Sequence, residues 1–337
     1  MLTHDKLRFV AAFLKNRRLR HLIGSALDYR LSILTKRVIL RHYPPAVMIE
    51  PTNICNLKCP LCPSGNGTLS RQRGMMSLCD FKSIVDQIHH KVGMLILWNQ
   101  GEPYLNPEFN QMVAYAAGKK LYTMTSTNAS LPLDHEAIVR SGLDRIIISM
   151  DGISEETYNS YRINGDYALV LDNMQKLIEV KKRLKSKTPC VVWQFIVMRQ
   201  NEHEIPAVRI RAQELGVDCL EFKTVQIYKP EDVIYLPKDH ALSRYTAEGQ
   251  DFELANKLLN RCRRLWTQPV INWDGELSIC CYDKDVLYKI GNVHDADFYQ
   301  LWTSDKMNKM RAKILHDRQS IEICRNCGEG IVQKLKL

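Results

Sequence analysis

The sequence has no hydrophobic run long enough to cross a bilayer, which takes about 20 consecutive apolar residues. Its first apolar run, residues 9–14, is flanked by charges and is too short for the apolar part of a secretory signal. Low-complexity segments are absent as well. These absences argue against a membrane-spanning or secreted protein. We therefore expect a cytoplasmic location, with membrane association as an alternative.

Acidic residues are scarce in the first 45 residues, where only Asp5 and Asp28 oppose ten Lys and Arg residues. The formal charge of the whole chain is +10, so the remainder is nearly balanced. Apolar residues of this segment roughly share one helical face, namely Leu19, Leu22, Ile23, Ala26, Leu27, Leu34 and Val38. We expect residues 1–45 to form a basic amphipathic arm that Pro44 and Pro45 end. It either packs on the protein with its basic face in solvent or, over residues 1–43, contacts an anionic membrane or a partner.

Cysteine is abundant, with eleven residues in a chain of 337. In a reducing compartment, clustered thiols indicate a metal site rather than disulfides. The close groups are Cys55/Cys59/Cys62, Cys280/Cys281 and Cys324/Cys327. Cys262 precedes the second and third of these groups. Cys79, Cys190 and Cys219 stand alone, and we interpret them as core or surface residues.

Short β-rich runs alternate with helical stretches from residue 46 onward. The expected strands are 46–50, 94–98, 121–126, 145–150, 191–197 and 219–225, and the expected helices are 80–90, 108–118, 134–141, 167–185 and 203–215. Such β-α repeats predict parallel strands with right-handed crossovers. The fold class is therefore α/β, as a partial (βα)6 TIM-like barrel over 46–225 with its chemistry at the carboxyl ends of the strands. A linker is expected over 226–261 and a small cysteine-rich domain over 262–330.

The strongest chemical signal is the CxxxCxxC spacing of Cys55, Cys59 and Cys62 directly after the first expected strand. Three thiolates can hold a [4Fe-4S] cluster and leave one iron open, whereas zinc sites favour two CxxC pairs or added histidines. With Pro51, Asn53, Asn56 and Pro60 around it, the motif resembles that of the radical S-adenosylmethionine (SAM) superfamily. The resemblance covers residues 46–330. It implies that the cluster cleaves SAM to a 5′-deoxyadenosyl radical, which abstracts hydrogen from a substrate carbon.

Three later motifs lie at the following strand ends. NQGEP (99–103) resembles the family's GGEP, STNAS (126–130) its TNG turn, and SMDG (149–152) with the later Arg162 its SxDG and downstream arginine. Asn99, Gln100 and Ala129 depart from the usual glycines. The resemblance implies that SAM is bound by Gly101, Glu102, Asn128, Ser149 and Arg162. A simple turn at Asn128, a helix-entry turn at Asp151 and Gly152, and a surface ion pair of Arg162 are the alternatives.

The C-terminal cysteines resemble those of the SPASM or twitch domains of this superfamily. The resemblance implies one auxiliary [4Fe-4S] cluster held by Cys262, Cys280, Cys324 and Cys327. The spacing from Gly275 favours Cys280 over Cys281 as the ligand. A structural zinc ion with four cysteines is the alternative.

A single auxiliary cluster is similar to the arrangement in radical SAM dehydrogenases that oxidise a secondary alcohol. This implies an oxidoreductase that dehydrogenates or epimerises a sugar-like or other small metabolite, with flavodoxin or ferredoxin as electron donor. The alternatives are a peptide (RiPP-type) maturase and a non-catalytic iron-sulfur or zinc module that anchors a partner or membrane. Nucleic acid is not an expected partner, because the arm has few aromatics. No general base is identified, since Glu221 and Lys223 on the sixth strand could simply pair with each other.

Overall fold

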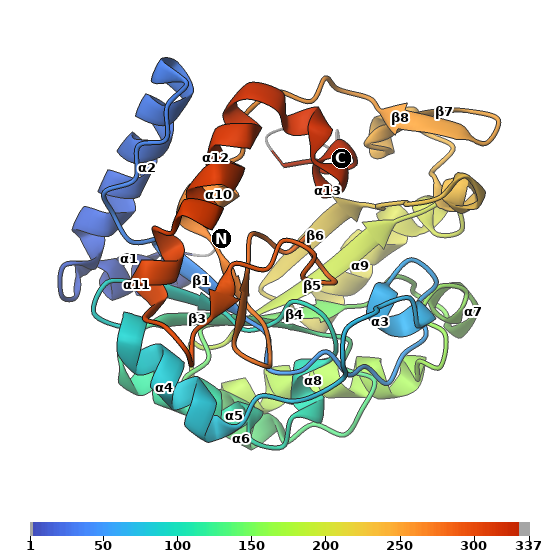
Figure 1. The fold of residues 1–337 in the computed structure, drawn as a ribbon. Helices are drawn as coiled ribbons and strands as arrows, with labels where there is room; N and C mark the ends of the chain where they lie inside the picture. The colour runs from blue at the N-terminus through green and yellow to red at the C-terminus, as the bar shows by residue number, and fades with distance from the viewer. Residues whose placement is uncertain (1–2, 330–337) are drawn as a thin grey trace.

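The computed structural model describes residues 3–329, so residues 1, 2 and 330 of the expected segments lie outside the described residues. One large sheet organises the molecule, with strand order β11-β10-β9-β1-β2-β3-β4-β5-β6 (Figure 1). Its strands are β1 (Ala46–Ile49), β2 (Met94–Ile96), β3 (Tyr122–Thr127), β4 (Arg145–Ser149), β5 (Cys190–Val197), β6 (Cys219–Thr224), β9 (Val270–Ile271), β10 (Glu276–Ser278) and β11 (Gly291–Asn292). A separate hairpin consists of β7 (Tyr245–Glu248) and β8 (Asp251–Leu254).

The helices fall into three groups along the chain. The N-terminal arm has α1 (Thr3–Leu14) and α2 (Arg18–Thr35), and the barrel has α3 (Pro63–Asn66), α4 (Leu78–Ile88), α5 (Phe109–Gly118), α6 (His135–Arg140), α7 (Glu155–Asn159), α8 (Tyr167–Arg183) and α9 (Ile205–Leu215). The C-terminal part has α10 (Arg264–Thr267), α11 (Phe298–Trp302), α12 (Asp305–Asp317) and α13 (Glu322–Arg325). None of the helices in residues 3–329 is both long and apolar enough to cross a membrane.

Strands β1 to β6 are parallel and adjacent in chain order, which confirms the predicted partial barrel. Helices α4, α5, α6 and α8 cover the outer face of the sheet (Figure 1). Strands β1, β2, β4 and β5 bury apolar side chains on this face, where Val47, Leu95, Ile146 and Val191 are fully buried. Because the strands run in the same direction, the loops after them gather at one edge of the sheet, where the predicted site residues lie.

The cysteine-rich C-terminal part joins the barrel through backbone pairing. Strand β9 runs parallel to β1, with Met48 opposite Val270, and β10 continues the sheet antiparallel to β9. The free edge of the barrel at β1 is thereby covered, which removes an exposed strand edge. The two predicted domains share one sheet.

Residues 226–261, which we expected to be a linker, contain more regular secondary structure than a linker would. They contain the 3-10 helices η3 (Pro230–Tyr235) and η4 (His240–Leu242) and the β7–β8 hairpin. Tyr245 and Ile227 are buried in one apolar cluster with Leu57 and Leu61 of the loop after β1. The polar composition of residues 226–261 does not reveal that Tyr245 and Ile227 are buried. They pack on the loop after β1, which is distant in sequence.

The N-terminal arm contains two helices that both pack on the barrel. Asp5 accepts from Tyr122 at 2.5 Å and from Arg145 at 2.8 Å, and Arg8 pairs with Asp144 at 2.7 Å. These contacts place α1 at the amino ends of β3 and β4. Helix α2 stands beside the C-terminal part, where Tyr29 contacts the ring of Trp266 (Figure 1).

Candidate functional site

The loop that follows β1 carries Cys55, Cys59 and Cys62. The amide of Cys62 donates to the carbonyl of Cys59 at 3.1 Å, and the amides of Gly65 and Asn66 donate to the carbonyl of Cys62 at 2.8 Å each. These bonds close a turn that leads into the short helix α3. The CxxC part of the motif is therefore held at the carboxyl end of β1.

The three cysteines belong to one apolar cluster that includes Leu57 and Leu61. Burial raises the pKa of Cys55 to about 12 and also raises the pKa of Cys59. Buried thiols ionise readily only where positive charge compensates for lost hydration. This donor set therefore fits a cationic metal group.

Two nitrogen donors face these sulfur atoms. Asn128 Nδ2 lies 3.8 Å from Cys55 Sγ, and Arg162 Nη1 lies 4.0 Å from Cys59 Sγ. Both would stabilise a thiolate. Among residues 3–329, no three Cys, His, Asp or Glu side chains converge on a position for a single metal ion.

Gly101 lies after β2 and presses against the cysteine loop. Its φ angle is +75°, and a Cβ atom there would lie 2.6 Å from the carbonyl oxygen of Thr52 and 2.7 Å from that of Ile54. The amide of Glu102 also donates to the Ile54 carbonyl at 2.8 Å. Only glycine fits this position, both in its backbone conformation and in the space available.

The Glu102 carboxylate connects the loop after β2 to the end of β3. It accepts hydrogen bonds from Thr127 Oγ1 at 2.8 Å, from the Asn128 amide at 2.7 Å and from the Tyr104 amide at 3.2 Å. Burial raises its pKa to about 7, although these donors favour the ionised form. The carboxylate thus positions this edge of the site, and its contact with the SAM ammonium stays a prediction.

Asn128 and Ser149 lie at the ends of neighbouring strands. Asn128 Nδ2 donates to Asn56 Oδ1 at 2.9 Å, which ties β3 to the cysteine loop. The Oγ of Ser149 lies 3.4 Å from that of Ser126. Both residues are at the same sheet edge as the cysteines, so the structure brings the predicted SAM-binding residues together. Their contacts with SAM stay predictions.

Arg162 forms a buried ion pair with Asp151. Its Nε and Nη2 atoms lie 2.7 and 2.6 Å from Asp151 Oδ2, while Asp151 Oδ1 accepts from the Ile196 amide at 2.7 Å. The predicted alternative of an ion pair is thus real, but the pair is buried beside Cys59 rather than on the surface. Arg162 consequently holds a positive charge next to the predicted cluster, and its SAM contact stays a prediction.

The C-terminal cysteines form a second buried group. Cys262, Cys280, Cys324 and Cys327 are each at most 7% exposed. Burial is the main cause that raises the pKa of Cys262 to about 12 and that of Cys324 to about 11, and the nearby Cys327 thiol adds to both shifts. The pKa of Cys280 is also raised well above its usual value by burial and by the neighbouring thiols.

Arg318 provides an independent indication of an anionic group at these cysteines. Its side chain is 1% exposed and donates to the carbonyls of Arg261 at 2.8 Å and Glu329 at 2.9 Å. Among the described residues it has no carboxylate partner, and its buried Nε atom has no hydrogen-bond partner. A cluster with four thiolates carries net negative charge and would compensate for this guanidinium. The residues therefore fit an iron-sulfur cluster.

Cys281 has a different environment from Cys280. Arg264 Nη1 lies 3.0 Å from Cys281 Sγ, and Arg264 Nε donates to Glu329 at 2.8 Å. Cys281 also lines a cavity, described below. The structure is in keeping with Cys280 as the ligand, which remains a prediction.

The sequence reasoning missed the ion pair of Glu50 and Arg71. Arg71 donates to both carboxylate oxygens of Glu50, which is fully buried at the end of β1. The same carboxylate accepts from the amide of Gln100 at 3.1 Å and from that of Trp273 at 3.4 Å. The only local signal is a glutamate that directly follows an apolar strand. The pair joins the cysteine loop, the loop after β2 and the C-terminal part.

Comparison with protein families decides the class of the site. The family model of the radical SAM superfamily matches residues 49–208, and that of the SPASM iron-sulfur cluster-binding domain matches residues 262–328. The chain belongs to the radical SAM superfamily. This radical SAM protein is an enzyme that uses a [4Fe-4S] cluster and SAM, and its SPASM domain carries an auxiliary iron-sulfur centre.

Curated relatives of this radical SAM enzyme have several activities. It is 23% identical over 295 residues to the tungsten-containing aldehyde ferredoxin oxidoreductase cofactor-modifying protein of Pyrococcus furiosus, covering 78% of this chain and 82% of that protein. It is 26% identical over 188 residues to the PqqA peptide cyclase of Gluconobacter oxydans, covering 55% of this chain. The chain spans about half the length of that cyclase.

Solved structures of the superfamily share its fold. Streptococcus suis SuiB bound to SAM aligns with a TM-score of 0.63 at 16% identity, covering 90% of this chain and 76% of SuiB. BtrN in complex with SAM and 2-DOIA aligns with a TM-score of 0.53 at 15% identity, covering 88% and 98% of the two chains. These alignments confirm the predicted α/β fold.

The radical SAM enzyme has a cavity of about 400 Å³ between the barrel and the SPASM domain. The barrel contributes Met48, Ile96, Trp98, Asn99, Gln100, Met124, Lys223 and Gln226, and the SPASM domain contributes Arg264, Gln268, Cys281, Tyr282 and Lys284. Its volume falls within the usual range of small-ligand sites. The cavity borders both the loop after β2 and the cysteine-rich domain.

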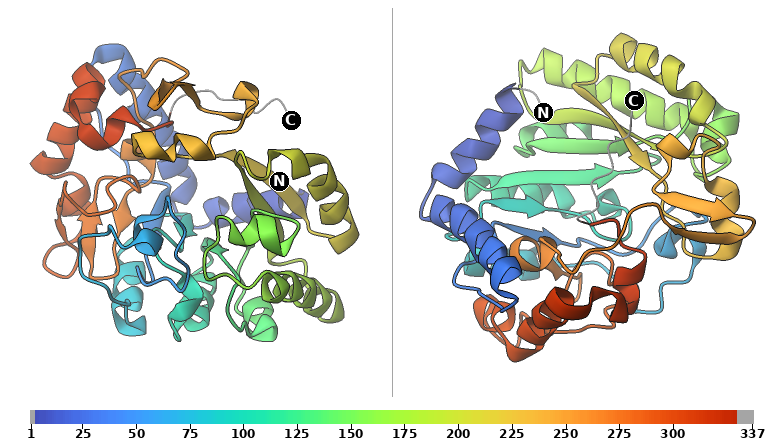
Figure 2. Two further views of the ribbon diagram at one scale, coloured as in Figure 1. Left: turned by 90° about the vertical axis from the view of Figure 1, so that its right-hand side faces the viewer. Right: turned by 90° about the horizontal axis from the view of Figure 1, so that it is seen from above.

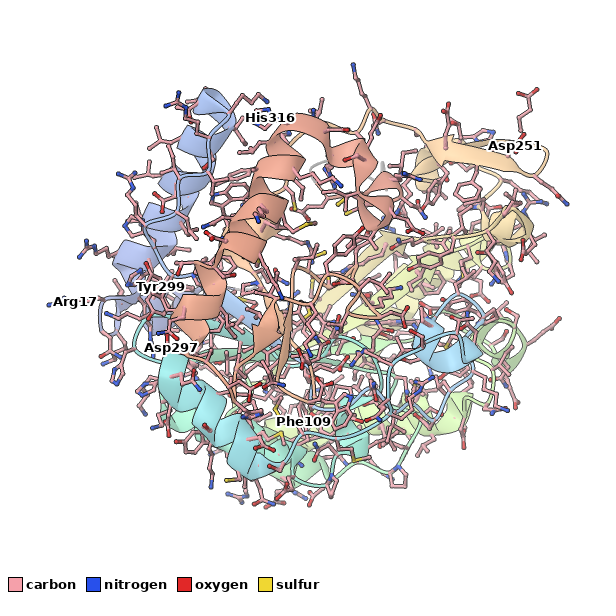
Figure 3. All side chains as sticks on the ribbon, viewed as in Figure 1. Arg17, Phe109, Asp251, Asp297, Tyr299 and His316 are labelled. Atoms are coloured by element: carbon pink, nitrogen blue, oxygen red, sulfur yellow. The ribbon has the colours of Figure 1, made fainter. Side chains whose placement is uncertain are left out.

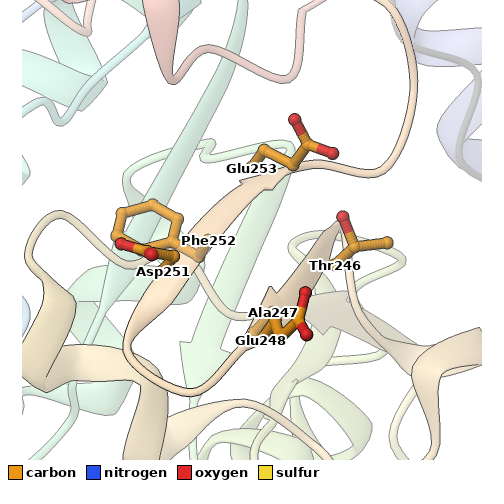
Figure 4. A pocket seen from close by; sticks show the side chains of 6 residues that line it. All are labelled: Thr246, Ala247, Glu248, Asp251, Phe252 and Glu253. Atoms are coloured by element: carbon orange, nitrogen blue, oxygen red, sulfur yellow. The ribbon is translucent and has the colours of Figure 1, made fainter.

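A larger hollow, of about 540 Å³, lies on the β7–β8 hairpin (Figure 4). It is lined by Thr246, Ala247, Glu248, Asp251, Phe252 and Glu253. None of these belongs to the cysteine loops or to the predicted SAM-binding residues. We therefore assign the chemistry to the smaller cavity.

Proposed function

We propose that this enzyme dehydrogenates or epimerises a sugar-like or other small, polar metabolite bound in the 400 Å³ cavity. The observation that supports this proposal is the composition of the cavity wall. The barrel supplies one part and the SPASM domain supplies the other, so a substrate there would border both the loop after β2 and the cysteine-rich domain.

The polar atoms of the cavity favour a substrate with hydroxyl or anionic groups. Among the described residues, Asn99 Oδ1 and Gln226 Nε2 are buried without a hydrogen-bond partner, and both residues line the cavity. A buried polar atom without a partner is costly, and a bound hydroxyl would satisfy it. Lys223, Arg264 and Lys284 give the wall positive charge.

Within this proposal, Cys55, Cys59 and Cys62 hold the SAM-binding cluster, and Cys262, Cys280, Cys324 and Cys327 hold one auxiliary cluster. When bound, the first centre and SAM supply hydrogen-atom abstraction, and the auxiliary centre supplies a route for an electron. The chain orients the substrate and shields it from water.

SAM would be bound by the loops after β2, β3 and β4, through Gly101, Glu102, Asn128, Ser149 and Arg162. Gly101 and Glu102 contact the cysteine loop, and Asn128 and Arg162 contact its sulfur atoms. A group bound at the cysteines would therefore lie next to all of these loops. The Arg162 guanidinium has five N–H donors. It can therefore bind the SAM carboxylate while it keeps its ion pair with Asp151.

Oxidation of an alcohol also releases its hydroxyl proton, and Lys223 is our candidate acceptor. It lines the cavity, and burial lowers its pKa below the usual value of 10.5. Its neighbour Glu221 pairs with Arg145 and not with Lys223, contrary to the simple pairing considered from the sequence. Lys223 is left facing the cavity.

A second candidate function is peptide maturation. The names of the PqqA peptide cyclase and of SuiB bound to its precursor peptide SuiA show that similar proteins act on or bind peptides. The cavity here has a volume of about 400 Å³, near the lower end of the range for ligand sites, which favours a small substrate. A non-catalytic anchoring module is not retained, because the chain belongs to a superfamily of enzymes.

A flavodoxin or ferredoxin would supply the reducing electron.

The test uses anaerobically reconstituted enzyme with SAM and a chemical reductant, offered panels of cyclitols and sugars and panels of short peptides. We expect sugar-like alcohols to stimulate 5′-deoxyadenosine formation. Dehydrogenation removes two hydrogen atoms from the product mass, whereas epimerisation leaves the mass unchanged and adds one deuterium in heavy water. Stimulation by peptides alone would overturn the proposal. The Cys55→Ala variant is the negative control, and Cys79→Ala, an exposed cysteine outside the site, is its matched control.

A further inference from the structure

Helix α2 is amphipathic in the reverse sense from a typical surface helix. Its face toward the protein is polar, because Arg18, His21, Ser25, Asp28 and Ser32 are buried there. The spacing of three, four, three and four residues places them on one side of the helix. The sequence prediction of a helix packed with its basic face in solvent did not foresee this orientation.

Each buried polar group on this face has partners that explain the orientation. Arg18 donates to the backbone carbonyls of His89, Ala12 and Lys119 at 2.9, 3.0 and 2.8 Å. Asp28 accepts from the amide of Arg41 at 2.7 Å. Rotating the helix would bring these side chains into solvent but leave their backbone partners buried without hydrogen bonds, at a large cost. The inward face is therefore determined by hydrogen bonds.

Helix α2 therefore exposes its apolar side chains, and α1 exposes apolar side chains as well. We call this surface the apolar stripe, and it consists of Leu7, Val10 and Leu14 on α1 and Leu19, Ile23, Leu27, Leu31 and Leu34 on α2. Every one of these side chains is exposed, from 37% at Leu31 to 79% at Leu34. Seen from above, the two helices lie along one side of the molecule, outside the sheet (Figure 2). A part of the surface that exposes several large apolar side chains usually marks an interaction site.

The charges around the apolar stripe have one sign. The exposed charged side chains of residues 4–43 are all basic, namely Lys6, Arg8, Lys15, Arg17, Arg20, Arg30, Lys36, Arg37 and Arg41. Arg17 projects outward at the turn between the two helices (Figure 3). The two acidic residues of this segment, Asp5 and Asp28, are 3% and 0% exposed. The accessible surface of the arm therefore carries positive charge beside the apolar groups and exposes neither of its acidic side chains.

We propose that α1 and α2 bind the surface of an anionic lipid bilayer, with the apolar stripe inserted among the lipids and the basic residues at the headgroups. Apolar insertion and electrostatic attraction together give stable peripheral binding. Each Lys or Arg near an anionic membrane contributes about 1 kcal/mol. A second copy of this chain is a poor occupant, because two faces of the same positive charge repel each other.

The location of the arm separates this surface from the chemistry. Asp5 and Arg8 bind Tyr122, Arg145 and Asp144 at the amino ends of β3 and β4. The cysteine loop and the SAM-binding residues lie at the carboxyl ends. The inference is independent of the proposed substrate, and membrane binding should leave SAM cleavage in solution unchanged.

The test is cosedimentation of the reconstituted holoenzyme with phosphatidylcholine vesicles and with phosphatidylcholine-phosphatidylglycerol vesicles. We expect binding to the anionic vesicles alone, with release as salt shortens the Debye length from about 10 Å at 0.1 M to about 3 Å at 1 M. The stripe variant Leu19→Gln/Ile23→Gln/Leu27→Gln should bind at least about tenfold more weakly, since it loses apolar insertion. These side chains point outward, so the variant should fold.

A matched control changes three exposed apolar residues elsewhere, as Ile210→Gln/Ile234→Gln/Leu287→Gln, and should bind as the unchanged protein does. SAM cleavage without substrate should be equal in all three proteins. Absence of binding to anionic vesicles would overturn the proposal, as would equal binding by the stripe variant. A dimer in light scattering that the stripe variant abolishes would assign the stripe to a second copy instead.

Discussion

Arg71 and Glu50 form a bidentate ion pair at the carboxyl end of β1, with Nη1–Oε2 and Nη2–Oε1 distances of 2.7 and 2.5 Å. The side chains are 9% and 0% exposed. Arg71 also donates to the carbonyl of Lys284 in the SPASM domain at 2.7 Å. This one pair therefore connects the cysteine loop to the domain that closes the cavity.

Replacing Glu50 with Gln should destabilise the enzyme strongly. The change keeps the shape but leaves the Arg71 charge buried without its partner, which costs about 3–5 kcal/mol in comparable sites. The measurement is the free energy of unfolding by denaturant. Glu136→Gln is the matched control, because its pairs with Arg140 and Arg183 are exposed and contribute about 0–1 kcal/mol. Equal effects of the two changes would show that the buried pair has no special role.

Gly101→Ala should prevent assembly of the SAM-binding site. The new Cβ would lie 2.6 Å from the Thr52 carbonyl oxygen, so the loop after β2 must move away from the cysteine loop. Gly67→Ala is the control, because Gly67 also has a positive φ angle, +81°, but a Cβ there meets nothing within 4 Å. We expect SAM binding, measured by calorimetry, to be lost in the first variant and kept in the second. Similar losses in both would attribute the effect to backbone strain alone.

Iron analysis should separate Cys280 from Cys281. We expect about eight irons in the reconstituted enzyme, as two [4Fe-4S] clusters. Cys280→Ser should lower this to about four, whereas Cys281→Ser should leave it unchanged because that thiol faces the cavity and Arg264. The reverse pattern would make Cys281 the ligand. Four irons plus one zinc ion in the unchanged enzyme would refute the auxiliary cluster.

The pH dependence of turnover should reveal whether Lys223 accepts the substrate proton. A base acts only when it is neutral, so kcat/KM should rise with pH as Lys223 loses its proton. Because burial lowers its pKa, the midpoint of this rise should lie below the usual value of 10.5. Lys223→Met should remove the rise and lower kcat, while Lys284→Met, at the same cavity, should keep it. An unchanged pH profile in Lys223→Met would exclude this role.

The strands and their order were predictable from the sequence. The six expected strands agree with β1 to β6 to within a few residues, because apolar runs of four to eight residues between helical stretches are a local pattern. The predicted site residues also gather, since parallel strands bring their following loops to one edge. The spacing of Cys55, Cys59 and Cys62, and the family resemblance that it carries, pointed to these three residues, and their role as cluster ligands stays a prediction.

Other features depend on contacts between distant segments, which a local pattern does not contain. The hairpin of residues 245–254 packs on a loop almost two hundred residues earlier, although its sequence reads as a linker. Glu50 and Arg71 lie 21 residues apart along the chain, and each residue alone is an ordinary charged side chain.

By itself, the sequence determined the β-α order of the barrel, the cysteine spacing and the positive charge of the arm, because each is a property of neighbouring residues. Only the tertiary structure decided which way the arm helices face. The leucines of α2 predict an inward apolar face, yet Arg18 and Asp28 lie inward instead, because carbonyls and amides of distant segments satisfy them there. Burial of those hydrogen-bonded groups leaves the apolar stripe on the outside.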